Sequence, residues 1–235
     1  MNIEKELIIA ILKLTGNGSI LNEQIYKDVR VPHNVALNLL KKLEKEGLIY
    51  FHNNLLEADS FQRLRLAVYA VQLGADLEYV CSFLGWREFE RVAVMAFERN
   101  GYEVVENLRF KHAARKWEID VVGLKKPLVV CVDCKHWRKG LYPSALKKIV
   151  ERQVERTFAF AESMNAFERF SFAAWGRVKF VPAVLSLIPS RFKFYSGVPV
   201  VPIFQLQDFL SQLPAHVDSL KHFGKSLSNK FNGGS

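Results

Sequence analysis

The sequence predicts an α/β protein with a mixed central sheet flanked by helices, preceded by a small α+β domain. Two observations predict this fold class. Residues 1–58 carry apolar side chains mainly at helical spacing and close with two short apolar strands, whereas residues 86–213 give the order helix, three strands, helix, two strands, helix. The second order is typical of a mixed sheet with helices on both faces.

Length and composition are those of a folded globular protein. A chain of 235 residues with 49% hydrophobic and 12% aromatic residues is long enough for one large domain or two small ones. No apolar run reaches the roughly 18 residues that span a bilayer, so we expect no membrane partner. Three cysteines, an odd number, give no disulfide framework. Together with the lack of a leader pattern, they predict a cytoplasmic protein.

The first predicted domain, residues 1–58, consists of three helices and a hairpin. Residues 3–14 carry a helical apolar stripe, and a short helix is expected at 22–29. Pro32, a favoured first-turn residue, begins a longer helix that ends at Gly47. A strand, a turn and a second strand follow as far as residue 57.

This order resembles a winged helix-turn-helix domain. In such domains the third helix contacts DNA, and here it would present Lys41, Lys42 and Lys45. The segment 1–57 is electrically neutral, with seven basic and seven acidic residues. Because winged helices also dock proteins, both DNA and a protein partner remain open for this domain.

A helical linker, residues 59–85, is expected between the two domains, with Asp59 as the N-cap of its first helix. The second domain, residues 86–213, begins with a helix that ends before Gly101. Residues 214–235 are expected to form a C-terminal tail. Between these limits the sequence predicts strands at 102–110, 116–124 and 128–136, a basic helix at 144–164, strands at 180–187 and 198–204, and a helix at 205–213.

Two of the predicted strands carry acids where a buried strand normally has Val or Ile. Alternation places Asp133 and Lys135 on one face of their strand and Cys134 on the other. Buried acids are unfavourable unless they are paired or bind a cation. Together with Asp120 on the preceding strand, this pair could hold a divalent cation and position a water, as a phosphodiesterase does. An ordinary ion pair between Asp133 and Lys135 is the alternative.

The cysteines Cys131 and Cys134 have C-x-x-C spacing. On a strand their side chains point to opposite faces, and no second Cys/His pair follows. We therefore do not expect a metal–thiolate site.

A helix with Glu90, a hairpin with Asp120 and then Asp133-x-Lys135 resembles the PD-(D/E)XK nuclease superfamily, which has a restriction-endonuclease-like fold. The segment from Phe89-Glu90 to Asn100-Gly101-Tyr102 is similar to the Mrr-type and archaeal Holliday-junction-resolvase-like branches. The proline that gives the superfamily the first letter of its name is missing, because Glu118-Ile119 precedes Asp120. Gln153 is followed four residues later by Thr157, so the Q-x-x-x-Y pattern of RecB-type members is absent as well.

The resemblance implies roles for individual residues. Glu90, Asp120, Asp133 and Lys135 would be catalytic, and Mg²⁺ or Mn²⁺ would be bound by Asp120, Asp133, the Cys134 carbonyl and Glu90. Periodicity alone does not choose between Glu88 and Glu90, and the resemblance favours Glu90. Glu118 could join the site or pair with Arg115.

The implied function is a metal-dependent DNA endonuclease of repair, recombination or restriction. A homodimer would supply the two sites needed to cut both strands. A catalytically inactive nuclease-like factor that binds DNA or protein, in transcription or repair, is the main alternative, and cleavage of RNA is not excluded by the sequence. Calorimetric titration with Mn²⁺ separates the enzyme from the inactive factor.

Positive charge is concentrated in residues 109–160, where thirteen Lys and Arg face five acids. Such a field suits a polyanionic substrate. On the basic helix, internal salt bridges to Glu151 and Glu155 are the alternative to phosphate contacts, and Arg156 is expected on the same exposed side. The nucleic-acid contacts expected in this domain are Arg115, Lys116, Arg138, Lys139, Lys147, Lys148 and Arg152.

Overall fold

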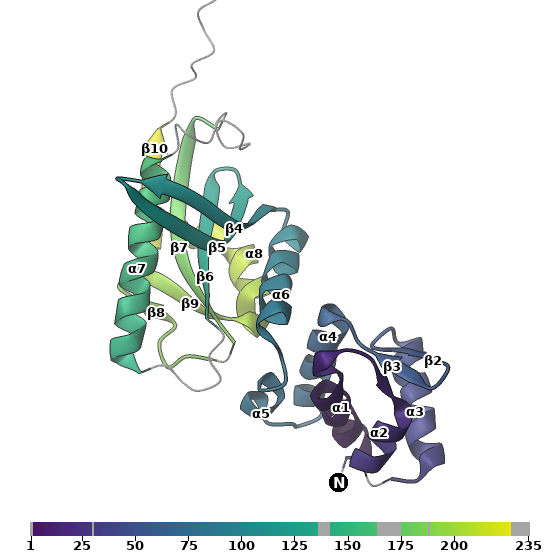
Figure 1. The fold of residues 1–235 in the computed structure, drawn as a ribbon. Coiled ribbons are helices and arrows are strands. Elements are labelled where there is room, and N and C mark those ends of the chain that lie inside the picture. Colours follow the sequence, from purple (N-terminus) through teal and green to yellow (C-terminus); the bar gives the residue numbers. More distant parts are fainter. Residues whose placement is uncertain (1, 30, 136–141, 164–174, 188, 227–235) are drawn as a thin grey trace, which may run out of the picture. The chain divides into compact units, whose positions relative to one another are not determined.

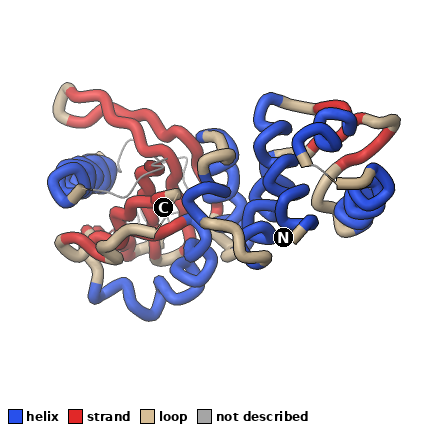
Figure 2. Tube along the Cα trace, turned by 90° about the horizontal axis from the view of Figure 1, so that it is seen from below, coloured by secondary structure: helices blue, strands red, loops and turns tan. Residues whose placement is uncertain are grey.

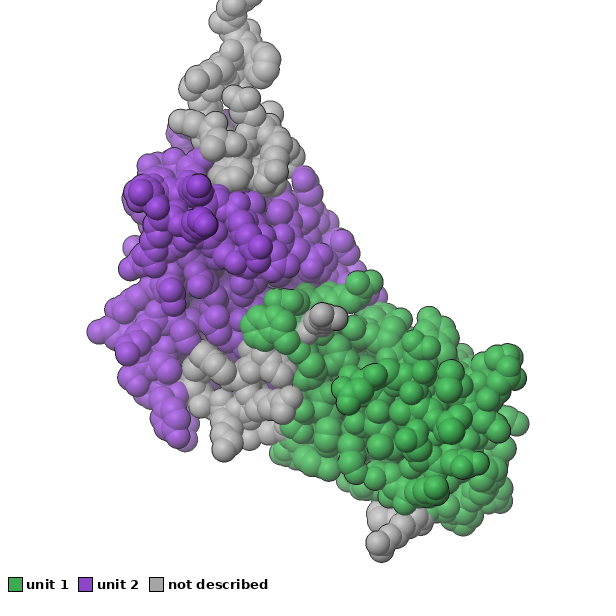
Figure 3. Space-filling view, in the orientation of Figure 1, with its two compact units in different colours: residues 1–92 green, residues 93–235 purple. Residues whose placement is uncertain are grey.

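The computed structural model describes residues 2–29, 31–135, 142–163, 175–187 and 189–226. The chain divides into two compact units, residues 1–92 and 93–235, which Figure 3 shows in different colours. No helix in these described ranges is both long and apolar enough to cross a bilayer.

Unit 1 combines helices with a small antiparallel sheet (Figure 1). The strands have the order β1-β3-β2, with Leu56 of β3 opposite Ile20 of β1 and Phe51 of β2. The hairpin between β2 and β3 turns at Asn53 and Asn54, both in the left-handed region that Asn tolerates. The elements are α1 (Ile3–Leu14), β1 (Ile20–Leu21), α2 (Asn22–Asp28), α3 (His33–Lys45), β2 (Tyr50–His52), β3 (Leu55–Glu57), α4 (Ser60–Gln72), α5 (Leu77–Cys81) and the first half of α6 (Trp86–Arg99).

The segment predicted as a linker, residues 59–85, lies in unit 1. Asp59 begins α4 with a capping box: its carboxylate accepts hydrogen bonds from the N–H groups of Phe61 and Gln62, both at 2.8 Å. The Gln62 side chain in turn accepts from the Asp59 N–H at 2.9 Å. Helix α4 packs against α1, so this segment belongs to the core of unit 1.

Unit 2 is built on one large sheet with the order β4-β5-β6-β7-β9-β8, and β10 pairs with β7 (Figures 1 and 2). Strands β4, β5 and β6 are antiparallel, and β6, β7 and β9 are parallel. The elements are β4 (Glu103–His112), β5 (Arg115–Lys125), β6 (Leu128–Lys135), α7 (Pro143–Glu162), β7 (Arg177–Ser186), β8 (Phe194–Tyr195), β9 (Val198–Pro202), α8 (Leu206–His216) and β10 (Phe223–Ser226).

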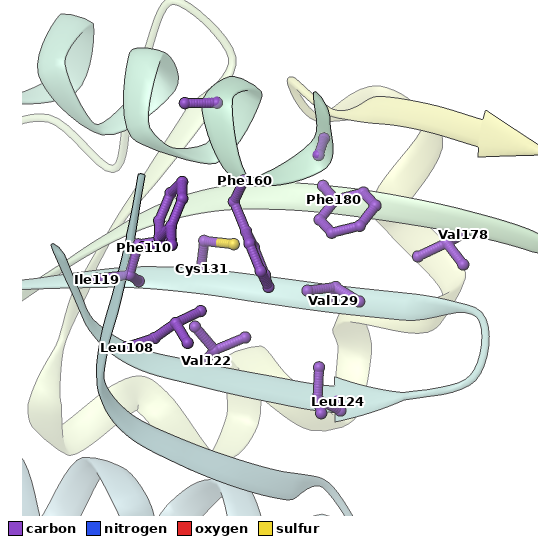
Figure 4. Packing of buried hydrophobic residues seen from close by; sticks show 12 residues of the cluster. Leu108, Phe110, Ile119, Val122, Leu124, Val129, Cys131, Phe160, Val178 and Phe180 are labelled. Carbon is purple, nitrogen blue, oxygen red and sulfur yellow. The ribbon is translucent and has the colours of Figure 1, made fainter. Parts of the chain in front are cut away.

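Helix α7 covers one face of this sheet. Its Phe160 lies between Phe110 and Phe180 in Figure 4, with ring centroids 5.5 Å from each. The strands below contribute Val122, Cys131 and further buried residues to the same cluster. This packing fixes α7 over β5 and β6, because displacing any of these rings would open a cavity.

Helix α6 packs on the opposite face, at Gly123 of β5. A Cβ at this glycine would collide with the ring of Phe97, which itself makes an edge contact with Tyr102. The two helices therefore lie on opposite faces of the sheet, and unit 2 is a mixed sheet flanked by helices, as the sequence predicts.

The C-terminal segment differs from the prediction. Residues 214–226 were expected within a tail, but α8 continues to His216 and β10 adds an edge strand to β7, with Phe223 opposite Phe180. Short strands such as β1, β8 and β10 carry no periodic signal of their own. Pairing with a longer neighbour forms them.

Candidate active site

The two strand acids meet through the register of β5 and β6, in which Val121 lies opposite Val132. Asp120 comes just before this pair and Asp133 just after it, so both carboxylates leave adjacent strands at the same level of the sheet. Asp120 Oδ2 also accepts a hydrogen bond from the backbone N–H of Cys134 at 2.7 Å. The sheet register thus converges two acids that are thirteen positions apart in sequence.

Asp133 is buried and is bound by two cations. The Lys135 Nζ lies 3.0 Å from its Oδ1 and 2.9 Å from its Oδ2, and Arg156 Nη1 of α7 donates to Oδ1. The Asp133 side chain is 2% exposed, but those of Lys135 and Arg156 are 27% and 18% exposed. The buried carboxylate therefore holds one ammonium and one guanidinium group at the edge of solvent.

The pKa of Asp120 is raised above its usual value. Burial is the main cause, because the charged form loses hydration, and the nearby Asp133 charge acts in the same direction. The Cys134 N–H and the charges of Lys135 and Arg156 oppose the rise only in part. An additional cation near Asp120 would stabilise its ionised form.

These residues fit a magnesium ion by their donor chemistry. Mg²⁺ is usually held by one or two carboxylates and completes its shell with water and phosphate oxygens. Asp120 and Asp133 supply two carboxylates at the same level of adjacent strands. Among the described residues, no group of three or more His, Cys, Asp or Glu side chains is placed to hold a metal ion, so this part of the chain has no site built from protein ligands alone.

The two cysteines of β6 lie in the core of unit 2. Cys131 and Cys134 are both buried and neither forms a disulfide, and burial raises the pKa of the Cys131 thiol to about 12. A thiol with that pKa stays protonated at neutral pH.

Helix α7 is attached to the acid-bearing strand by Gln153. This buried side chain donates from Nε2 to the carbonyl of Cys131 at 2.7 Å, two residues before Asp133. Arg156 follows Gln153 by three positions and so lies on the same side of the helix. The bond to β6 therefore also fixes where the guanidinium of Arg156 meets Asp133.

Arg156 departs from the sequence-based expectation. It was placed among the exposed phosphate-tracking residues of the helix, whereas the structure turns it toward Asp133. Its spacing from Gln153 was the available signal, since a residue three positions from a buried glutamine borders the buried face.

The two glutamates of α6 have different surroundings. Glu88 accepts from the Gly85 N–H and pairs with Arg63, so its charge is used inside unit 1. Glu90 is half-buried and lies in the same unit, near the point where α6 passes into unit 2. Its role as a third carboxylate remains a prediction.

The expected DNA-contacting lysines of α3 are not equivalent. Lys42 Nζ lies 2.8 Å from Glu4 and 3.4 Å from the Tyr69 hydroxyl, so its charge is paired within unit 1. Lys41 and Lys45 are exposed. Any contact of this helix with a polyanion would therefore rest mainly on these two.

On the β4–β5 hairpin, Arg115 lies 3.6 Å from Glu155 and stacks 4.0 Å above the ring of Trp117. Glu118 pairs with Arg109 on the neighbouring strand at 3.2 Å, a partner that neither of the two alternatives considered for it includes. Lys116 is exposed and lies directly opposite Lys111, which sequence reasoning missed. Like charges in this position repel, and a bound anion would relieve them.

The remaining basic residues divide between the described and undescribed parts of the chain. Lys147 lies 3.9 Å from Glu151, which is the internal salt bridge given as the alternative to phosphate contact. Lys148 and Arg152 are exposed on α7. Arg138 and Lys139 lie outside the described residues.

Comparison with known proteins identifies a relative of this chain and a family model that matches part of it. A curated protein of Archaeoglobus fulgidus, named only as uncharacterized, is 31% identical over 129 residues, which cover 54% of this chain and 91% of the relative. The chain belongs to the same family as this archaeal protein. Residues 85–170, which include both strand acids, match the family model described as NERD, nuclease-related domain. This match indicates a nuclease-related function.

Two solved structures are similar to parts of the chain. Protein VC1899 from Vibrio cholerae is 13% identical with a TM-score of 0.39, covering 92% of this chain and 52% of its own length. The protein of unknown function AF1548 is 15% identical with a TM-score of 0.35, covering 51% of this chain and 65% of its own length. The chain thus spans less than two thirds of either.

Proposed function

We propose that unit 2 is a metal-dependent DNA endonuclease of the PD-(D/E)XK type, which hydrolyses phosphodiester bonds in DNA repair, recombination or restriction. The convergence of Asp120, Asp133 and Lys135 within the nuclease-related region carries this proposal. The mixed sheet, with the acids on its second and third strands and helices on both faces, supports a restriction-endonuclease-like fold.

Asp120, Asp133 and the Cys134 carbonyl would hold Mg²⁺ or Mn²⁺, with Glu90 as a further carboxylate. A bound ion of this kind polarises a phosphodiester and lowers the pKa of a coordinated water. The chain's own contribution is positional. Asp133 holds the Lys135 ammonium next to the acid pair, from where it can orient the attacking water and stabilise negative charge that develops on the phosphate.

Unit 1 would place the substrate. Three helices with the strand order β1-β3-β2 and an exposed Lys41 and Lys45 on α3 support a winged helix-turn-helix domain. The paired Lys42 and the neutral charge of residues 1–57 favour a modest contribution to DNA affinity. Docking of a protein partner is the alternative role, and a homodimer would allow both strands to be cut.

The activity is tested with a panel of labelled DNAs: single-stranded, duplex, flap, fork and four-way. Each is incubated with Mg²⁺ or Mn²⁺, and an RNA of matched sequence is included. We expect cleavage by the wild type and none by Asp133→Ala or Lys135→Ala. Asp208→Ala on α8 and Lys126→Ala in the β5–β6 turn are matched controls that should cut normally, and circular dichroism verifies folding. Equal cleavage by all five proteins would assign the activity to another site.

A second candidate function has an observation in its favour. Asp133 already has two cationic partners, so the site is balanced in charge without a metal. This arrangement suits a catalytically inactive, nuclease-like factor that binds DNA or protein. Calorimetric titration with Mn²⁺ separates the two candidates, because only the enzyme needs to bind the ion at millimolar concentration.

A further inference from the structure

Charge balance around Asp133 suggests an additional function for α7. One buried carboxylate with one lysine would already be neutral, yet Arg156 also donates to Asp133 Oδ1. Lys135 and Arg156 together offset the charges of Asp133 and the adjacent Asp120, and both cations lie at the rim of the site. An anion arriving from solvent would meet these two cations directly.

Arg156 is built to bind such an anion. A guanidinium has five N–H donors in a planar fork that matches the oxygens of a phosphate. Among the described residues, Arg156 donates one hydrogen bond, from Nη1, and 18% of its side chain is exposed. Within this part of the chain, its Nε and Nη2 donors can therefore bind an anion that arrives from solvent.

We propose that Arg156 is a phosphate-binding residue of this site, held on Asp133 in the free protein and released to a substrate phosphate when a divalent cation takes over that carboxylate. This inference rests on the proposed function. It adds an exchange of partners: the same carboxylate binds either the guanidinium or the ion, and the freed guanidinium binds the substrate.

The exchange predicts two effects of opposite sign for Arg156→Gln. Without the guanidinium, Asp133 loses one competing cation, so Mn²⁺ should bind more tightly to the DNA-free protein. Without the same group, DNA should bind more weakly. A residue that only braces the fold would lower both affinities or neither.

The first readout is calorimetric titration of the DNA-free proteins with Mn²⁺. An opposite charge within about 4–6 Å shifts the affinity of a carboxylate for a proton by tenfold or more, so we expect Arg156→Gln to bind Mn²⁺ roughly tenfold more tightly than the wild type. Arg177→Gln is the matched control. Arg177 is exposed at the start of β7, at the opposite end of the sheet from Lys135, and its loss should leave the titration unchanged.

The second readout is binding of a short duplex across a salt series, once with Ca²⁺ to avoid cleavage and once with EDTA. With Ca²⁺, Arg156→Gln should weaken binding and reduce the slope of log K against log salt by about 1, the value of one phosphate contact. With EDTA the difference from the wild type should shrink, because Arg156 then remains on Asp133. Arg177→Gln should follow the wild type in both series.

Arg156→Lys covers the case in which the glutamine variant does not fold. It keeps a positive charge beside Asp133 in addition to Lys135, so Mn²⁺ affinity should stay near that of the wild type. Loss of the planar guanidinium should weaken DNA binding with Ca²⁺. Unchanged DNA affinity in both Arg156 variants, or unchanged Mn²⁺ affinity in a folded Arg156→Gln, overturns the inference.

Failure of this inference is distinguishable from failure of the proposed function. A wild type that cleaves DNA while Arg156→Gln changes neither affinity keeps the enzyme and removes the exchange. A wild type that cleaves nothing, combined with the two opposite shifts, removes the enzyme and keeps the exchange. Absence of Mn²⁺ uptake by wild type and Arg156→Gln alike overturns both.

Discussion

Among the described residues, each unit buries one charged side chain in its core, and the two differ in how exposed the partners of that charge are. In unit 1, Arg63 is 3% exposed and donates to the carbonyls of Leu12 at 2.7 Å and Phe83 at 2.5 Å, to Thr15 at 2.6 Å and to Glu88. In unit 2, Asp133 is 2% exposed, but its partners Lys135 and Arg156 lie at the rim.

The difference distinguishes a charge that stabilises the fold from a charge that is available for binding or catalysis. The donors of Arg63 are directed at fixed oxygens from four segments of unit 1, so the guanidinium ties α4 to the end of α1 and the start of α6. No substrate could reach it without breaking the fold. The two cations on Asp133 are partly exposed, so they can exchange partners while the carboxylate stays in place. A buried charge with open partners is therefore the better candidate for function.

The largest effect is expected for Asp133→Asn, which keeps the size of the side chain and removes its charge. Cleavage should fall about a thousandfold or more, because Lys135 loses the group that positions it at the acid pair. The measurement is single-turnover cleavage of the best DNA from the panel. Because Lys135 and Arg156 can turn to water, the free energy of unfolding in urea should fall less for Asp133→Asn than for Arg63→Met. A larger fall for Asp133→Asn would mean that Asp133 stabilises the fold as much as Arg63 does.

Arg63→Met tests the structural member of the pair. It leaves Glu88 and several carbonyls without their partner, and the free energy of unfolding should fall by about 3–5 kcal/mol. Urea denaturation followed by circular dichroism measures this loss. Arg65→Met is the matched control, since Arg65 is exposed. Its contacts are hydrogen bonds to the carbonyls of Glu46 and Gly47, at 3.2 and 3.3 Å, and a cation–π contact 5.8 Å from the Phe61 ring. Similar losses in both variants would contradict the structural role of Arg63.

Gly123→Ala shows whether unit 2 responds independently of unit 1. The added methyl would collide with the buried ring of Phe97, so unit 2 should lose about 1–3 kcal/mol. Gly224→Ala on β10 meets no atom within 4 Å and should be neutral. Two separate urea transitions, of which only one moves, would support independent units. A Gly123→Ala protein as stable as the wild type would mean that α6 does not pack tightly on β5.

The smallest effect is expected at Glu4, a carboxylate near the surface of unit 1. Burial alone would raise its pKa, but hydrogen bonds from Lys42 at 2.8 Å and Tyr69 at 2.9 Å outweigh burial, and the pKa lies below the ordinary value of 4.5. A lowered pKa stabilises the fold above the ordinary value, and this contribution disappears as the pH falls through the folded pKa.

Glu4→Gln should therefore be slightly less stable than the wild type at neutral pH, and the two urea midpoints should converge as the solution becomes more acidic than pH 4.5. A gap that persists well below that pH would point to packing of the side chain as its source. Lys5→Gln is the matched control, because Lys5 is a neighbour on α1 outside this network.

Much of the fold follows from local patterns. The apolar stripe of α1, the capping box at Asp59 and the turn at Asn53 and Asn54 are each visible within a few residues of sequence. The long strands β4 to β7 and the helix α7 lie within a few residues of their expected bounds. Strand β10 was missed because four residues form a strand only when a partner such as β7 is present.

The sequence by itself determined which chemistry the chain can offer: two acids and a lysine on neighbouring strands, because strand periodicity and a short turn are local properties. Only the tertiary structure decided which charged side chains pair with one another. Helix α7 brings Arg156 to Asp133, and α4 brings Arg63 to Glu88, from 23 and 25 residues away along the chain. Such partners are chosen by how helices dock on a sheet or on one another, and that choice depends on the whole core.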